Sequence, residues 1–146
     1  MVRRAFTVLF VLALAMAACA DGDQPVSDAS MQLTFDGDTC TYEGPTLLRA
    51  GPAALVFRNT SDGRAGVNLL RHKGDETIQD AIDYLGEEPS SKHGASWMEG
   101  VGTWRGTLPG ESHTWEGNLK PGSHSMVCAS IAPHGVWYGT GLTVED

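Results

Sequence analysis

The stretch SMVCASIAPHGVWYGTGLTVED, residues 125–146, decides the fold of this chain. Small, β-branched and aromatic residues lead into a Gly-containing turn and then into a final apolar run, a pattern typical of two antiparallel strands. Cys128 falls in the first of these strands, whereas His134 and Trp137 fall in the predicted turn before the last strand. The stretch therefore predicts a β-hairpin that closes a sheet.

Similar segments recur upstream, separated by Gly, Pro, Asn and Asp. Strands are predicted at residues 31–35, 40–42, 53–59, 65–72, 101–108, 112–118, 123–130 and 139–144. Short strands at such spacing indicate a sandwich of two antiparallel sheets. One segment, residues 75–86, instead has an apolar face at helical spacing and predicts one inserted short helix, begun by Asp75 or by Thr77 with Asp80. The predicted fold class is therefore all-β with one helix.

The first residues have the features of an export signal. Two arginines precede an apolar run from Ala5 to Ala18, which is shorter than the roughly 20 residues needed to cross a bilayer. The segment Met16-Ala17-Ala18-Cys19 resembles the bacterial lipobox, and the resemblance implies that Cys19 becomes the lipidated, palmitate-carrying first residue of a membrane-anchored protein. Ordinary cleavage nearby, leaving a secreted protein, is the alternative. Residues 1–18 are thus predicted to be a signal peptide, residues 19–30 an acidic tether, and residues 31–146 one domain.

The charge of the chain limits its partners. All 18 acidic residues lie after residue 18, together with eight of the ten Lys and Arg, so the predicted mature part has a formal net charge of −10. Such a field repels nucleic acid and anionic headgroups. Membrane attachment should therefore depend on acyl chains rather than on a basic surface.

Two cysteines remain once Cys19 is assigned to lipid. Cys40 and Cys128 form an even pair in an oxidising compartment, which favours one disulfide between them.

The stretches LVFRNTSDGRAGVNLLRH and LPGESHTWEGNLKPGSHSMVCASIAPHGVWYGTGLTVED resemble the cupredoxins. That resemblance implies a Greek-key β-sandwich and, in copper-binding members, a site of two His, one Cys and a weak axial Met. The chain departs from this pattern, because Asn68 stands nearest the place of the first His and Trp137 occupies the place of the Met. Cys128 and His134 match the remaining two positions, but a Cys128 bound to Cys40 is unable to hold copper.

Two uses of the histidines stay open. A copper carrier or redox protein would combine Cys128 and His134 with His72 or His124 as metal ligands. A zinc or copper site of His113, His124 and His134 is a further possibility, since the strands that carry them should be neighbours. Against both, strand alternation places His124 on the same face as Met126 and Cys128, which favours a structural histidine in the core.

The four tryptophans are Trp97, Trp104, Trp115 and Trp137, of which two are expected in the core. Trp97 and Trp137, both predicted in loops, are the candidate contacts for a protein or envelope-polymer partner. No sequence motif of an enzyme occurs, and the acidic residues of the helix are expected on its solvent face. We therefore expect a non-enzymatic, lipid-anchored binding module in the bacterial cell envelope, with no cofactor, or alternatively a copper-binding redox protein.

Overall fold

The computed structural model describes residues 31–85, 95–132 and 134–146. The predicted signal peptide, Cys19 and the predicted tether lie outside the described residues, as does the side chain of Trp104. Among the helices that the structure describes, none has the length and apolarity needed to cross a membrane.

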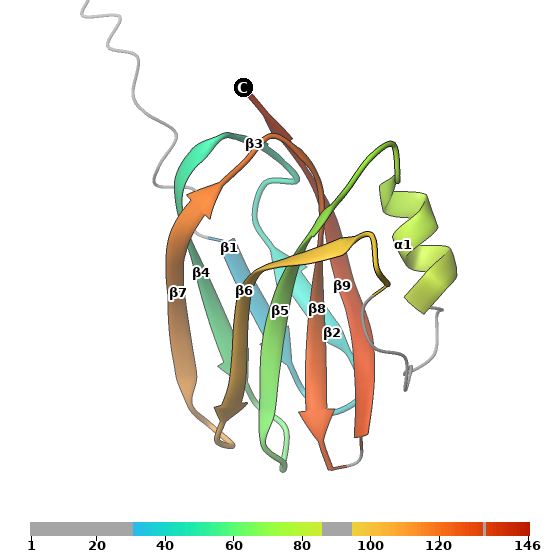
Figure 1. Ribbon diagram of the computed structural model, residues 1–146. Helices are drawn as coiled ribbons and strands as arrows, with labels where there is room; N and C mark the ends of the chain where they lie inside the picture. Colours follow the sequence, from blue (N-terminus) through green and yellow to red (C-terminus); the bar gives the residue numbers. More distant parts are fainter. Residues whose placement is uncertain (1–30, 86–94, 133) are drawn as a thin grey trace, which may run out of the picture.

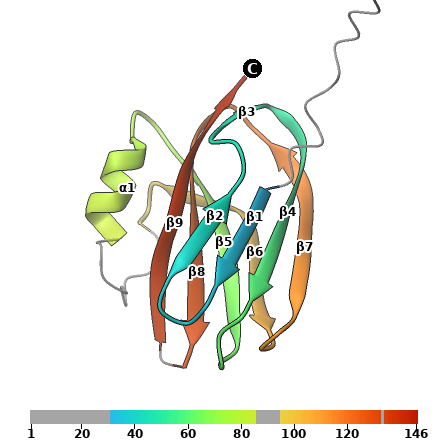
Figure 2. The same cartoon turned by 180° about the vertical axis from the view of Figure 1, so that it is seen from behind.

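The described residues form nine strands in two sheets (Figure 1). The four-stranded sheet has the order β2-β1-β4-β7, with strands Cys40–Glu43, Met31–Phe35, Gly51–Asn59 and Ser112–Leu119. The five-stranded sheet has the order β3-β9-β8-β5-β6, with strands Leu47–Arg49, His134–Glu145, Gly122–Ile131, Ala65–His72 and Met98–Thr107. Figure 2 shows the smaller sheet from the other side. The predicted all-β sandwich of two sheets with one helix is confirmed.

Two strand pairings are parallel, and the sequence pattern did not predict them. β1 pairs with β4 and β3 pairs with β9 in parallel, whereas the other pairings are antiparallel. β3 has only three residues and one buried side chain, Leu48, so it lacks the alternation that reveals a strand. Both parallel pairs join strands that are not consecutive along the chain, so neither sheet is a simple meander.

The main core lies between the two sheets. Met31, Leu33 and Phe35 alternate along β1 and are almost completely buried, because successive side chains of a strand point to opposite faces. Met126 and Cys128 from β8 meet them from the other sheet. The alternation of apolar residues in the sequence therefore identifies the inner faces correctly.

Helix α1, Ile78–Leu85, covers part of the outer face of the larger sheet. It starts three residues later than the predicted range of 75–86, and the start is fixed by Thr77 and Asp80. The Asp80 carboxylate accepts hydrogen bonds from the Thr77 amide and hydroxyl, and the Asp80 amide donates to the Thr77 hydroxyl. This reciprocal arrangement is a capping box, so Asp75 is not the cap. Ala81 and Leu85 are the buried residues of the helix.

The final hairpin differs from its prediction. β9 begins at His134 rather than at residue 139 and pairs with β8 as far as Ile131. Gly135 makes this possible, since a Cβ there would lie 2.7 Å from the ring of Trp137. The predicted loop position of Trp137 is therefore wrong, because the residue lies inside a strand.

Candidate functional site

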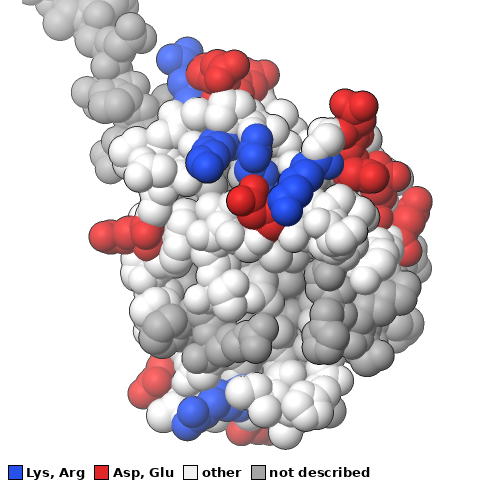
Figure 3. Space-filling model, in the orientation of Figure 1, with Lys and Arg blue, Asp and Glu red and all other residues white. Residues whose placement is uncertain are grey.

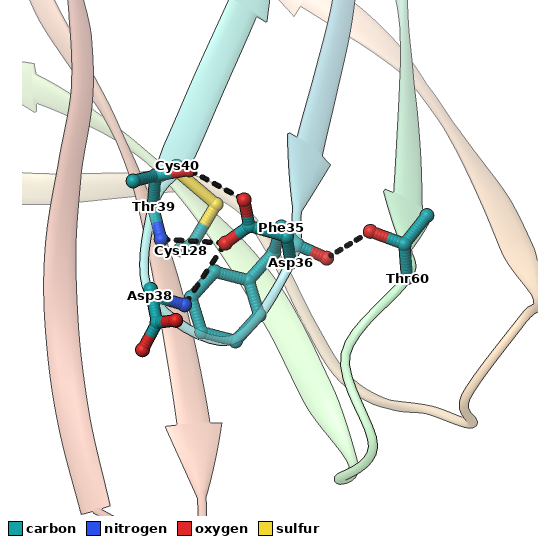
Figure 4. Close-up of a disulfide and its surroundings, with 7 residues drawn as sticks. All are labelled: Phe35, Asp36, Asp38, Thr39, Cys40, Thr60 and Cys128. Carbon is teal, nitrogen blue, oxygen red and sulfur yellow. Dashed lines mark hydrogen bonds between the residues drawn. A yellow bond between two sulfur atoms is a disulfide. The ribbon is translucent and has the colours of Figure 1, made fainter.

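A disulfide joins the two sheets at the place where the sequence pattern suggested a copper thiolate. Cys40 in β2 and Cys128 in β8 are linked with an S–S distance of 2.10 Å across 88 residues of chain (Figure 4). Cys128 is completely buried. The predicted disulfide is confirmed. It uses the Cys128 sulfur that a copper ion would need as a thiolate.

The turn before Cys40 is held by Asp36. Its carboxylate accepts hydrogen bonds from the backbone amides of Asp38 and Thr39, at 2.9 and 2.7 Å, and from the Thr39 hydroxyl. These bonds keep the pKa of Asp36 below its usual value. The Thr60 hydroxyl donates to the Phe35 carbonyl and ties the same turn to the end of β4 (Figure 4). Cys40 therefore reaches Cys128 from a constrained turn.

Bulky side chains fill the space around the disulfide. The ring of Trp137 packs on that of Phe35 with centroids 4.7 Å apart, and only 9% of Trp137 is exposed. Gly139 lies against the bond, since a Cβ there would come within 2.9 Å of the Cys40 sulfur. The position that the cupredoxin pattern gives to an axial Met is thus occupied by an indole with no soft donor atom.

Asn68 is not directed toward this place. It pairs in register with Val127, which lies under α1 on the outer face of the sheet, whereas its neighbour Val67 pairs with Cys128 on the inner face. Alternation along β5 therefore turns the Asn68 side chain away from the disulfide. The position that the cupredoxin pattern places nearest the first copper His therefore directs its side chain away from Cys128.

The other predicted metal ligands are also separated. His124 is on the inner face and is completely buried, with Nδ1 3.1 Å from the Gly122 carbonyl oxygen. His72 is on the outer face, and His134 is exposed at the start of β9. Within residues 31–85, 95–132 and 134–146, no group of three or more His, Cys, Asp and Glu side chains is placed to hold a metal ion. The donor set of a copper site does not fit this arrangement.

His72 has a role of its own beneath α1. Its Nε2 lies 2.8 Å from the Ser125 hydroxyl oxygen, and only 4% of the residue is exposed. Nδ1 has no hydrogen-bond partner among the described residues. The backbone of Glu76 and Thr77 lies near the ring and favours its protonated form, which opposes the effect of burial on the pKa. Burial keeps the pKa of His72 below its usual value. His72 is therefore held as a neutral ring at pH 7.

Trp97 belongs to the same cluster under α1. Its ring makes T-shaped contacts with the rings of His72 and Tyr84, with centroids 5.3 and 6.1 Å apart. It is partly buried, immediately before β6. Of the two predicted partner contacts, Trp97 keeps some exposed surface in a turn. Trp137 has almost none, because it fills the core beside Phe35.

Trp115 closes one side of the sandwich. Its indole comes from β7 and lies over Gly102 of β6 and Gly117 of its own strand, where a Cβ would fall within 2.4 and 2.2 Å of it. It packs against the main core. This ring therefore serves the fold by bridging the edges of the two sheets.

A polar crevice lies beside the connection between β5 and α1. Figure 1 shows the course of this connection. It has a volume of about 380 Å³ and is bounded on one side by the β5–α1 connection and on the other by Gly122 and Ser123 at the start of β8. Arg71, His72 and Lys73 contribute to its lining, followed along the chain by Asp75 and Glu76.

Sequence reasoning missed this crevice. Asp75 and Glu76 were expected on the solvent face of the helix, but they precede α1 and line the crevice instead. No motif connects residues 71–77 with residues 122–123, because only the β5–β8 pairing brings them together. The basic group followed by an acidic pair in RHKGDE, residues 71–76, is the one signal in the sequence that could have drawn attention to it.

Comparisons with known proteins give similarity to two auracyanins, which are cupredoxins. A dithionite-reduced auracyanin from the photosynthetic bacterium Roseiflexus castenholzii is 18% identical, with a TM-score of 0.47, over 82% of this chain and 99% of that one. Auracyanin B is 19% identical, with a TM-score of 0.43, over 80% of this chain and 88% of that one. No protein-family profile matches the chain, and no curated protein matches its sequence.

Similarity at this level does not transfer a ligand or a partner to this chain. What the chain shows by itself is a two-sheet β-sandwich in which the predicted thiolate, Cys128, forms a disulfide and the predicted Met position, Trp137, is a core tryptophan.

Proposed function

We propose that this chain is a non-enzymatic binding module, anchored by lipid at Cys19 outside the cytoplasm and built on a cupredoxin-like sandwich without type-1 copper. The observation that carries the copper-free part is the Cys40–Cys128 disulfide, since a sulfur in a disulfide is unavailable as a thiolate ligand. The separation of His72, His124 and His134 supports the same view.

The copper part is tested with two measurements on the unreduced protein. Mass spectrometry after alkylation should find Cys40 and Cys128 unmodified by the alkylating reagent, and addition of Cu(II) should give no intense visible absorption. The alternative, a copper carrier using Cys128 and His134, requires an intense Cu–thiolate band and metal retained after dialysis. Two alkylated cysteines together with such a band would overturn the proposal.

The anchoring part is tested with Cys19→Ser. Wild-type protein produced in a bacterial host should incorporate a labelled fatty acid and sediment with membranes, because one lipidated cysteine with further acyl chains gives stable attachment. C19S should lose the label and move to the soluble fraction, whereas Cys40→Ser should keep the label. Equal labelling of wild type and C19S would show that the lipobox resemblance is misleading.

A further inference from the structure

The crevice beside the β5–α1 connection has a charge pattern that selects its ligand. Figure 3 shows Lys and Arg side chains gathered on the upper part of this face with acidic side chains next to them. Arg71 and Lys73 supply positive charge to the lining, and Asp75 and Glu76 supply an equal number of negative charges. The chain as a whole has a formal net charge of −8, so this balance differs from the rest of the molecule.

The charges at the rim are available to a ligand. Lys73 and Asp75 are exposed, and neither forms an ion pair within the part of the chain that the structure describes. Arg71 is more constrained, since it donates two hydrogen bonds to the Pro121 carbonyl and lies 3.7 Å from Glu99. Lys73 and Asp75 are therefore the side chains that a ligand would engage first.

A buried polar group also points to a ligand here. His72 lines the crevice with only 4% of its surface exposed, and its Nδ1 has no hydrogen-bond partner. Nε2 is engaged with the Ser125 hydroxyl, so Nδ1 is the polar atom of this ring that a ligand could engage, as donor or acceptor according to the tautomer.

The lining argues against ligands of a single charge. A divalent cation would need a cluster of acidic or histidine donors, and the described residues contain none. A simple anion would meet Asp75 and Glu76, and a simple cation would meet Arg71 and Lys73. A small solute with one carboxylate and one ammonium group satisfies both sets of charges. The volume of about 380 Å³ is at the lower end for a ligand site and suits an amino acid or a dipeptide.

We propose that this crevice binds a small zwitterion of the amino-acid or short-peptide class, with its carboxylate toward Lys73 and its ammonium toward Asp75. The inference rests on the proposed binding function and names a ligand class for it. Its failure can be recognised separately, because the thiol count, the copper titration and the fatty-acid label do not involve the crevice.

The test is calorimetry and amide NMR on the full chain purified in detergent. The probes are glycine, L-serine and glycylglycine, and the single-charge controls are acetate and methylammonium. Saturable binding of at least one zwitterion is expected, with shifts of the Lys73, Gly74 and Ser123 amides. Acetate and methylammonium should bind at least about tenfold more weakly, which corresponds to losing one charge-assisted hydrogen bond.

Exposed residues provide the variants and their matched controls. Lys73→Met and Asp75→Asn should each weaken zwitterion binding by about tenfold or more. Lys120→Met and Glu145→Gln change exposed residues of the same charge outside the crevice lining and should leave binding unchanged. The proposal is overturned if no zwitterion binds, if acetate binds as well as glycine, or if the shifts occur away from the crevice.

Discussion

Asn59 shows how one buried amide can hold several loops. The residue ends β4 and is completely buried. Its Nδ2 donates to the carbonyls of Gly63 and Thr107, at 2.7 and 2.9 Å, and its Oδ1 accepts from the Ser61 amide and hydroxyl. The turn between β4 and β5 and the end of β6 thus share one polar centre. Such a fully satisfied buried group contributes more than a surface hydrogen bond.

We predict that Asn59→Ala lowers the free energy of unfolding by about 3 kcal/mol, because its former partners stay buried without hydrogen bonds. Urea denaturation followed by tryptophan fluorescence measures the change. Asn118→Ala is the matched control, since Asn118 is exposed on β7 and should change stability by less than about 0.5 kcal/mol. Equal effects of the two substitutions would show that the Asn59 bonds contribute no more than surface ones.

Some side-chain positions could be predicted from the sequence and others could not. Strand alternation correctly placed Cys128 and Met126 on the inner face, because it depends only on neighbouring residues. The even number of cysteines left after Cys19 correctly predicted the disulfide, because it depends only on a count. Trp137 was misplaced because its strand continues past a glycine that usually indicates a turn. The exposed charges at Lys73 and Asp75 have no periodic signal at all, since they matter only through their position in the fold.

At the scale of elements, a close contact between a large and a small residue helps to seat α1 on the sheet. Ile78 begins the helix and lies over Gly141 of β9, where a Cβ would be 2.3 Å from Ile78 Cγ2. A branched side chain has little freedom to move aside. The sequence predicted the helix from its apolar face but gave no indication of which strand would receive it, because a glycine has no side chain that a pattern can detect.

We predict that Gly141→Ala destabilises the protein by about 1–3 kcal/mol, since the added methyl group overlaps with Ile78. In the double variant Gly141→Ala/Ile78→Ala the loss should be smaller than the sum of the two single losses, because the smaller side chain at position 78 makes room for the methyl group. A double-mutant cycle measured by urea denaturation checks this. Simple additivity would indicate that the two residues do not press on each other in solution.

At the scale of the whole molecule, the disulfide joins the sheets near one end. In the chain-entropy account, a bond that closes 88 residues raises the free energy of unfolding by about 4–5 kcal/mol. We predict that Cys40→Ala/Cys128→Ala lowers stability by about 2–5 kcal/mol. Denaturation with and without a reducing agent provides the check, since reduction should destabilise the wild type and leave the double variant unchanged. A wild type insensitive to complete reduction would contradict the structural role of the bond.

The two buried histidines should make the whole sandwich sensitive to mild acid. Burial is the main cause that lowers the pKa of His72 and of His124. The pKa of His72 is raised in part by the backbone of Glu76 and Thr77 and by the charge of Asp80. The pKa of His124 is raised in part by the Gly122 carbonyl and lowered further by the charge of Arg71. The unfolded chain therefore binds protons at these rings near pH 6.5 that the folded chain does not.

Stability should be complete above the unfolded pKa of about 6.5 and should fall as the pH is lowered toward the folded values. Folding lowers the pKa values of Asp36 and Asp80, so the stability that these carboxylates contribute is lost only below about pH 4. Their titration therefore does not affect the change in stability between pH 5 and pH 7. We predict that the urea midpoint drops between pH 7.5 and pH 5. His72→Gln and His124→Gln should each lower the midpoint at pH 7.5 but reduce its dependence on pH, because each removes one group that must protonate on unfolding. A wild-type midpoint that stays constant over this range would mean that the rings take up protons in the folded state as readily as in the unfolded chain.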